Sequence, residues 1–495
     1  MGASAHIAKG LLWLVGGRLA NAVLSFGSTA VLARLLTPRD FGIVAASWIV
    51  LALANTLFDG AFGVNLLRKR LQRPEDVRTT LTMGMMVAAV FMLIVVATAP
   101  LIGGFFRFPD LPMVLAISSL VIPCKAIYAI GTAQLQRANS FAAIAGATLA
   151  GQLLGYVVVA IPLSLMGAGI WSLVAAIVVS GIAEATFVGV RARLPLRPML
   201  DPEAVREVAR TGLFSVANIM NWIANTGANA IVGRLMGAAD LGLYSRGWKL
   251  LDLVVGATAT PLSRALLPNL AKLRDDRDRL ERAFLDVLGI VLPGYAVLSA
   301  LLALQSPLIV YLALGSQWGD TVPVAQIMFA TLLPRCAVKV SENFAVALGR
   351  SMSTAVRQAL YAMFMVSGTL VGWRAGINGV AVAASAAMIL FYLISMHYAV
   401  RIGGIDAGAV LTRHVRALLL GALTAAVDFA LLRLLQNQAM PIRHLIAGST
   451  AALATGLLFL AAPAFWIGDA NAGKFRLMIG NRLRFAVPRP TFGRS

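Results

Sequence analysis

Charged side chains interrupt otherwise apolar stretches of this sequence, and they are the residues whose types and spacing allow chemistry. A charged group at the centre of a membrane-spanning helix costs at least about 2.5 kcal/mol when it faces lipid. We therefore expect such groups to line a wet cavity, to form pairs or to extend to the membrane surface. Two trios recur at intervals of three or four residues, so each trio shares one helix face. They are Arg246, Lys249 and Asp252, and Arg335, Lys339 and Glu342.

The cations in these stretches suit an anionic ligand, because Arg binds phosphate through paired hydrogen bonds and Lys binds it as a point charge. The candidate binding residues are Arg18, Lys125, Arg246, Lys249, Arg335 and Lys339. Arg264 is a weaker candidate because it lies near one end of its span. The same stretches contain almost as many acids, so internal ion pairs that hold the helices together are the alternative.

Two carboxylates in apolar stretches are candidates for ion coupling, because an acid inside a membrane can carry a proton during transport. Asp59 is isolated within its stretch, and Glu342 belongs to the second trio. For Asp59 the alternative is a salt bridge to Arg18 on the preceding helix.

The composition predicts a membrane protein with no soluble catalytic domain. Of the 495 residues, 59% are hydrophobic and 13% are charged, whereas soluble domains have about 45–50% and about 25%. The net charge of +21 comes from cations between the apolar runs, which is typical of orientation signals and not of a nucleic-acid surface. Neither Cys124 and Cys336 nor the four histidines have metal-ligand spacing, so we predict no metal and no cofactor.

We predict fourteen membrane-spanning helices, each near the length that crosses about 30 Å of hydrocarbon. They cover residues 8–33, 41–67, 79–105, 111–136, 141–165, 168–190, 211–236, 241–270, 284–313, 322–348, 354–373, 376–400, 411–435 and 442–467. With both termini in the cytoplasm, about 28 of the 42 cations fall inside and about seven outside, as the positive-inside rule requires. The first span lacks a cleavage site and is expected to stay in place. The Asp201-Pro202-Glu203 sequence predicts the start of a surface helix.

The chain repeats itself at an offset of 200 residues. Residues 30–42 match residues 230–242 without a gap, including the pairs Arg34/Arg234, Asp40/Asp240 and Gly42/Gly242. Pro38 and Gly42 are expected to act as helix breakers there, and Asp40 and Asp240 are positioned to cap the next helix. An even number of spans separates the copies, so the halves are parallel repeats about an axis along the membrane normal.

The predicted fold is therefore all-α and polytopic, with two six-helix lobes and a C-terminal helix pair. The boundaries are 1–200 and 201–402 for the lobes, 403–468 for the additional pair and 469–495 for a basic cytoplasmic tail. A cleft between two such lobes suits a substrate that is exposed alternately to each side of the membrane.

The repeated turn also resembles a known family. Residues 33–42 (ARLLTPRDFG) are similar to the first-turn signature of Wzx-like polysaccharide-biosynthesis flippases of the multidrug/oligosaccharidyl-lipid/polysaccharide exporter superfamily. Residues 241–251 (LGLYSRGWKLL) and 267–270 (LPNL) resemble the second-lobe signature. The resemblance covers roughly residues 1–400.

This resemblance implies the transport of undecaprenyl-pyrophosphate-linked oligosaccharide from the cytoplasmic to the periplasmic leaflet of a bacterial inner membrane, for lipopolysaccharide or exopolysaccharide biosynthesis. The cationic residues would then bind the pyrophosphate headgroup, and a polysaccharide polymerase would be a partner. The alternatives are a multidrug exporter of the same superfamily and a polysaccharide-assembly protein that transports nothing. An enzyme is disfavoured, because the outer loops are short and the sequence has no phosphate-binding P-loop.

Overall fold

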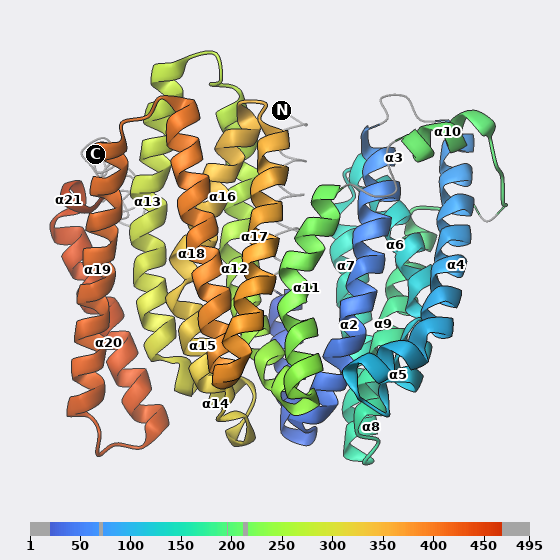
Figure 1. Ribbon diagram of the computed structural model, residues 1–495, viewed down its shortest axis with the longest axis horizontal. Coiled ribbons are helices and arrows are strands. Elements are labelled where there is room, and N and C mark those ends of the chain that lie inside the picture. The colour runs from blue at the N-terminus through green and yellow to red at the C-terminus, as the bar shows by residue number, and fades with distance from the viewer. Residues whose placement is uncertain (1–19, 69–72, 196, 211–215, 468–495) are drawn as a thin grey trace, which may run out of the picture. The chain divides into compact units, whose positions relative to one another are not determined.

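The computed structural model describes residues 20–68, 73–195, 197–210 and 216–467. These residues form helices joined by short turns, and no strand occurs among them (Figure 1). The predicted all-α membrane fold is therefore confirmed. The chain divides into two compact units. Unit 1 consists of Met1–Ala257, Ile309–Ala325 and Ala355–Ala387, and unit 2 of Thr258–Leu308, Gln326–Thr354 and Met388–Ser495.

Unit 1 begins with a helix whose described part covers residues 20–35. Its further helices are α2 (Pro38–Leu57), the π-helix η1 (Phe58–Gly63), α3 (Val64–Arg68), α4 (Pro74–Phe106), α5 (Leu111–Ser118), α6 (Val121–Arg137), α7 (Phe141–Gln152), the π-helix η2 (Leu153–Ala160), α8 (Ile161–Leu165), α9 (Ile170–Arg191), α10 (Pro202–Arg210), α11 (Val216–Met236) and the first part of α12 (Ala238–Ala271).

Unit 2 contains the rest of α12 and the helices that follow, apart from the two segments Ile309–Ala325 and Ala355–Ala387, which belong to unit 1. The helices that follow are α13 (Arg277–Leu304), α14 (Ser306–Ala313), α15 (Thr321–Ala330), α16 (Leu332–Ala347), α17 (Ser351–Gly372), α18 (Gly376–Gly403), α19 (Ala407–Leu434), α20 (Met440–Ala461) and α21 (Pro463–Ile467). The short 3₁₀ turns η3 (Ser316–Trp318) and η4 (Trp373–Ala375) lie in the segments of unit 1. The last helices α19 and α20 stand side by side and both pack on α13 (Figure 1).

Ten helices among the described residues are long and apolar enough to cross a membrane, or eleven if one bent pair counts as a span. The predicted count of fourteen is not confirmed. The first predicted span lies largely outside the described residues. Two further predicted spans fall in one run, Met352–Gly403, and the bent pair α15 and α16 is the span predicted at 322–348.

Helix α11 forms where a span was predicted but is not among the ten. Its sequence contains four asparagines, which lower its hydropathy: Asn218, Asn221, Asn225 and Asn229. The Asn225 amide donates to the side-chain oxygen of Asn221 at 3.0 Å, and Gln358 of α17 donates to the same oxygen at 3.2 Å. Two of the four amides are therefore bonded within unit 1, which reduces the cost of placing them in an apolar setting.

The predicted surface helix is confirmed as α10. The Asp201 carboxylate accepts from the backbone N–H of Ala204 at 2.9 Å and so caps it. Arg73, directly before α4, forms ion pairs with Glu203 at 3.0 Å, with Asp76 at 3.5 Å and with Asp201 at 3.6 Å. The Glu203 carboxylate, with smaller contributions from the other two acids, raises the pKa of the Arg73 guanidinium. These bonds attach α10 to the start of α4.

The repeated turn starts α2 with a capping box. The backbone N–H of Asp40 donates to the Thr37 hydroxyl at 3.3 Å, and the N–H of Thr37 donates to the Asp40 carboxylate at 3.0 Å. Such a cap stabilises a helix by about 1 kcal/mol. In the second copy the residue before the helix is Gly237 with φ 101°, which has no side chain to offer.

The two copies of the turn meet each other inside unit 1, at the first residues of α2 and α12. A Cβ atom at Gly42 would overlap the carbonyl oxygen of Ala238 and lie 2.6 Å from its carbonyl carbon. A Cβ atom at Gly242 would do the same to Pro38, at 2.7 Å from its carbonyl carbon. Since each pair differs by 200 residues, the contact is reciprocal, as expected for two parallel repeats around one axis.

The repeated arginines also act reciprocally, because each reaches the end of a helix in the other half of the repeat. Arg34 donates to the carbonyl oxygen of Leu312, in the last turn of α14, at 2.9 Å. Arg234 donates to the carbonyl of Phe105, in the last turn of α4, at 2.6 Å. Such carbonyls have no partner inside their own helix, so a guanidinium satisfies and electrostatically stabilises them.

We predict that Gly42→Ala and Gly242→Ala each lower the free energy of unfolding by about 1–3 kcal/mol, because the added methyl group must displace backbone atoms. Gly256→Ala is the matched control, since Gly256 lies in the same helix as Gly242 and its Cβ would meet nothing within 4 Å. That control is expected to gain about 0.5–1 kcal/mol of helix propensity. Thermal unfolding of the detergent-solubilised protein measures all three, and equal effects at Gly242 and Gly256 would refute the tight crossing.

Candidate functional site

The predicted site residues are distributed over both units, so each group is described within its own unit. Unit 1 holds Asp59, Lys125, Arg246 and Lys249, and unit 2 holds Arg335, Lys339 and Glu342. Arg18 lies outside the described residues, and so does its expected salt bridge to Asp59.

Lys125 on α6 pairs with an acid on the neighbouring helix α9. Its Nζ lies 3.4 Å from Oε2 of Glu184, and the two side chains are only 19% and 17% exposed. The same Nζ lies 5.8 Å from the ring centroid of Tyr128, one turn further along α6. This is an internal ion pair, the arrangement that the sequence left open as the alternative for the cations.

Asp59 adds a second acid to this group, which we call the Lys125 cluster: Asp59, Lys125, Tyr128 and Glu184. Asp59 is exposed, lies on the π-helix η1 and interacts electrostatically with Lys125. Single π-helical turns within α-helices occur frequently at functional sites. With two carboxylates and one ammonium, the cluster has an excess of negative charge when both acids are ionised, which suits a coupling cation or proton better than a phosphate.

The neighbours of Arg246 on α12 are aromatic side chains. Its guanidinium carbon lies 4.5 Å from the ring centroid of Phe41, and Tyr156 on the π-helix η2 interacts with it electrostatically. No ion pair among the described residues includes Arg246, and its Nε is buried without a hydrogen-bond partner. A guanidinium in an apolar span with no acid paired to it can bind an anionic ligand by donating two or more hydrogen bonds.

Lys249 lies three residues further along α12 and pairs with Asp252 at 3.8 Å. Both side chains are more than half exposed, at 58% and 60%. The spacing of three therefore places the two charges on one helix face, as the sequence predicted. Exposed pairs of this kind contribute little stability, about 0–1 kcal/mol, so Lys249 can exchange its partner at low cost.

In unit 2 the three predicted residues lie on α16, which packs on α13. Arg335 is buried, with 8% of its surface exposed, whereas Lys339 one turn later is exposed. Asn343, at the next turn, donates to the Ser263 hydroxyl of α12 at 2.8 Å. The face that carries the charges of α16 therefore runs from a buried guanidinium to an exposed ammonium.

A buried network that the sequence did not predict joins α13, α19 and α20. The Gln305 amide nitrogen donates to both carboxylate oxygens of Asp428, at 2.8 and 2.9 Å, and the Gln305 oxygen lies 2.9 Å from Nδ1 of His444. Asp428 is fully buried and His444 is 4% exposed. An acid within a span was visible in the sequence, but its partners lie more than a hundred positions away or on another helix, so spacing alone gave no signal.

Among the described residues, no group of three or more His, Cys, Asp or Glu side chains is arranged to hold a metal ion. Cys124 and Cys336 are free thiols.

Comparison with known proteins links this arrangement to a family and a fold. Residues 31–323 match the model of a family described as polysaccharide biosynthesis protein. The succinoglycan biosynthesis transport protein ExoT of Rhizobium meliloti (strain 1021) is 24% identical over 326 residues, 65% of this chain and 65% of that protein. The lipopolysaccharide biosynthesis protein WzxC of Escherichia coli (strain K12) is 25% identical over 306 residues, 60% of this chain and 61% of that protein. The matches thus span less than two thirds of these relatives.

Solved structures show the same fold. A lipid II flippase MurJ in an inward closed conformation superposes with a TM-score of 0.72 and 13% identity, over 90% of this chain and 98% of that one. An inward-facing multidrug resistance MATE family transporter of the MOP superfamily has a TM-score of 0.60 and 14% identity, over 79% of this chain and 100% of the transporter chain. The expected superfamily fold is therefore confirmed.

We predict that Lys125→Met lowers the free energy of unfolding by about 3 kcal/mol, because it leaves the Glu184 carboxylate buried without its cation. The charge swap Lys125→Glu/Glu184→Lys should recover most of that loss, since the pair is re-formed in reverse. Lys249→Met is the control, because its partner Asp252 is exposed and the expected change is below about 0.5 kcal/mol. Equal losses at Lys125 and Lys249 in a denaturant titration would contradict the buried pair.

We also predict that Gln305→Leu lowers the free energy of unfolding by about 1–3 kcal/mol, because the buried Asp428 carboxylate loses both hydrogen bonds. Adding Asp428→Leu should restore part of the stability, since an apolar pair leaves fewer buried polar groups unpaired. Gln438→Leu, at an exposed position, is the control. The network would be unimportant if Gln305→Leu and Gln438→Leu gave the same melting temperature.

Proposed function

Because the chain belongs to the polysaccharide biosynthesis protein family, we propose that it is a flippase for undecaprenyl-pyrophosphate-linked oligosaccharide. It moves this lipid from the cytoplasmic to the periplasmic leaflet of a bacterial inner membrane by alternating access, for lipopolysaccharide or exopolysaccharide biosynthesis. The family match covers more than half of the chain. Relatives named for succinoglycan transport and lipopolysaccharide biosynthesis, and the fold shared with a lipid II flippase, support this substrate class.

The observation that carries the proposal is the guanidinium of Arg246, which has an aromatic face beside it and no acid paired with it among the described residues. A pyrophosphate headgroup must cross hydrocarbon with its negative charge, and a cation inside a span offsets that cost. Lys249, with its exposed acid partner, lies one turn away on the same helix and adds a second charge. Arg18, Lys125, Arg335 and Lys339 are proposed to contribute from elsewhere in the chain, Lys125 when protonation of Asp59 removes the excess negative charge of its cluster.

The topology and the lobes are part of the proposal. We propose that both termini lie in the cytoplasm, which the excess of cations in the connections on the same side of the membrane supports. The lobes are residues 1–200 and 201–402, followed by the helix pair at 403–468 and a basic tail at 469–495. The reciprocal crossing of Gly42 and Gly242 supports two parallel repeats, because each copy presents the same backbone atoms to the other.

Ion coupling is proposed at Asp59 and Glu342. For Asp59 the support is its exposure within the Lys125 cluster, where protonation of Asp59 would leave Glu184 paired with the Lys125 ammonium. The chain is proposed to act as a transporter without catalysis of its own, to use no cofactor or nucleic acid, and to deliver its product to a polysaccharide polymerase.

We expect Arg246→Met to reduce apparent affinity for the lipid-linked substrate by about tenfold to a hundredfold, since hydrogen bonds to charged groups contribute about 1.5–3 kcal/mol. The assay uses proteoliposomes that contain undecaprenyl-pyrophosphate-linked oligosaccharide, and a lectin outside the vesicles reports the sugars that have crossed. Arg246→Lys should retain part of the activity, because a point charge remains. Arg350→Gln, at an exposed position in a predicted cytoplasmic connection, controls for net charge.

Charge reversal at Lys125, Arg335 or Lys339 is expected to abolish glycan transport while the protein still inserts in the membrane. Unchanged transport in Arg246→Met and in all three reversals would exclude the cationic site. Export of an organic cation by the wild-type protein, with no transport of the lipid-linked sugar, would favour the multidrug exporter instead.

A further inference from the structure

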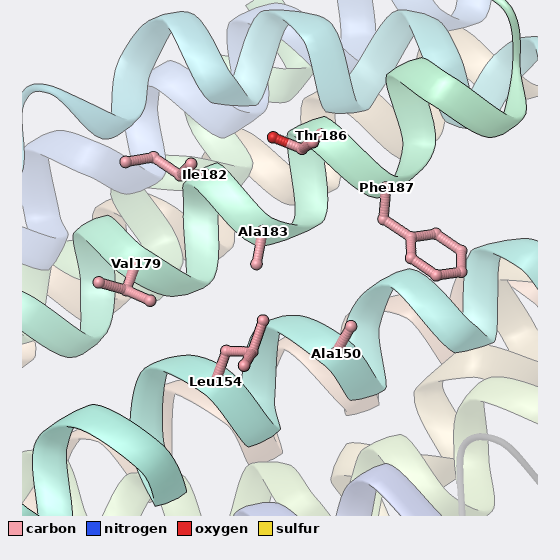
Figure 2. Close-up of a pocket in the computed structure, with 7 residues that line it drawn as sticks. All are labelled: Ala150, Leu154, Val179, Ile182, Ala183, Thr186 and Phe187. Carbon is pink, nitrogen blue, oxygen red and sulfur yellow. The ribbon is translucent and has the colours of Figure 1, made fainter.

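An apolar groove runs along unit 1, and none of the predicted site residues lines it. It has a volume of about 400 Å³ and lies between the α7–η2 segment and α9. Ala150 and Leu154 line one wall, and Val179 and Ala183 face them from the other (Figure 2). Thr186 is the polar lining residue, and the Phe187 ring stands at one end of the row (Figure 2).

The groove exists because glycines and alanines shape the contact between the two segments. A Cβ at Gly155 would lie 2.6 Å from the carbonyl oxygen of Ala176, and a Cβ at Gly151 would lie 2.6 Å from Cγ of Glu184. The backbones are therefore close on the inner side. On the outer side Ala150 and Ala183 have too little side chain to fill the space between the helices.

The open side of the groove is apolar and exposed. Leu154 is 44% exposed and Ile182 is 50% exposed. In a membrane protein such side chains contact hydrocarbon and not water. The groove therefore offers a place for a lipid chain that fits against both segments at once.

A positive charge stands at the Phe187 end. The guanidinium carbon of Arg191, in the last turn of α9, lies 5.7 Å from the centroid of the Phe187 ring. Arg193 lies two residues further along the chain and is also exposed, and none of the ion pairs among the described residues includes either arginine. In the proposed topology both lie at the cytoplasmic surface, where they can bind a lipid phosphate.

We propose that this groove is a binding site for an anionic phospholipid of the cytoplasmic leaflet, with one acyl chain along Ala150, Leu154 and Ala183 and the phosphodiester on Arg191 and Arg193. The groove favours a phospholipid over the proposed substrate, because Arg246, the cation proposed to bind the pyrophosphate, does not line it, and its apolar lining ends beside Arg191. The site is separate from Arg246 and from the Lys125 cluster, and binding there does not depend on transport.

The test titrates the purified full-length protein with phosphatidylglycerol or phosphatidylcholine and counts bound lipid by native mass spectrometry. The wild-type protein should prefer phosphatidylglycerol. Arg191→Gln should reduce that preference by about fivefold, as expected for about 1 kcal/mol per cation near an anionic lipid. The double variant Arg191→Gln/Arg193→Gln should abolish it, whereas Arg206→Gln, an exposed cation on α10, should leave it unchanged. An unchanged preference in the double variant would overturn the proposal.

Filling the groove tests the chain-binding part. Ala183→Phe and Ala150→Leu should each lower binding of both lipids about tenfold, whereas Val158→Phe should not. Val158 lies on η2, is 54% exposed and does not line the groove. Undiminished binding in both filled variants would refute the site. If undecaprenyl phosphate displaced phosphatidylglycerol from the wild-type protein, the groove would belong to the substrate and the phospholipid proposal would be wrong.

Discussion

The structure depends on the close crossing of α2 and α12, where the absence of side chains at Gly42 and Gly242 lets the two backbones touch. It fixes more than the backbone, because Phe41 directly precedes Gly42, and Arg246 follows Gly242 by one turn. Phe41 thereby comes within 4.5 Å of the Arg246 guanidinium, and its other neighbour is the Trp318 ring at 5.3 Å. Trp318 in turn donates to the carbonyl of Ala33 at 2.8 Å. The position of the Arg246 guanidinium therefore depends on glycine, with no side chain, at positions 42 and 242.

The repeat is symmetric in its backbone but not in its charges. The positions that correspond to Arg246, Lys249 and Asp252 in the first copy are Ala46, Ile49 and Ala52. Ala46 and Ile49 are buried, at 0% and 8% exposure. One copy of the motif has kept an apolar face that packs, and the other carries a charged face. The two copies of the turn thus share the structural glycines, whereas the charged face occurs in the second copy.

Much of the fold follows from patterns that act over short distances in the sequence. The capping box at Thr37 and Asp40, the start of α10 and the shared face of Lys249 and Asp252 each involve residues three positions apart. The Lys125–Glu184 pair could not be predicted in this way, because 59 positions separate its members and helix rotation decides the contact. The π-helices were also unpredicted, since their extra residue per turn leaves no clear apolar period. Four asparagines lower the hydropathy of α11, which explains why it forms a helix but is not apolar enough to count among the ten spans.

Buried polar groups join the additional helix pair, α19 and α20, to α13. Asp428 on α19 and His444 on α20 both bond to Gln305, which ends α13, and a Cβ at Gly448 would lie 3.0 Å from the same glutamine side chain. The hydroxyls of Thr424 and Thr455 form a second buried bond between α19 and α20 at 3.1 Å. Asp428 and His444 would lose their bonds to Gln305 if the pair separated from α13, at a cost of about 1–3 kcal/mol for each, whereas the threonine bond lies within the pair. The pair is therefore bound to α13 as part of unit 2, and in the proposed transport cycle we expect it to move together with that helix.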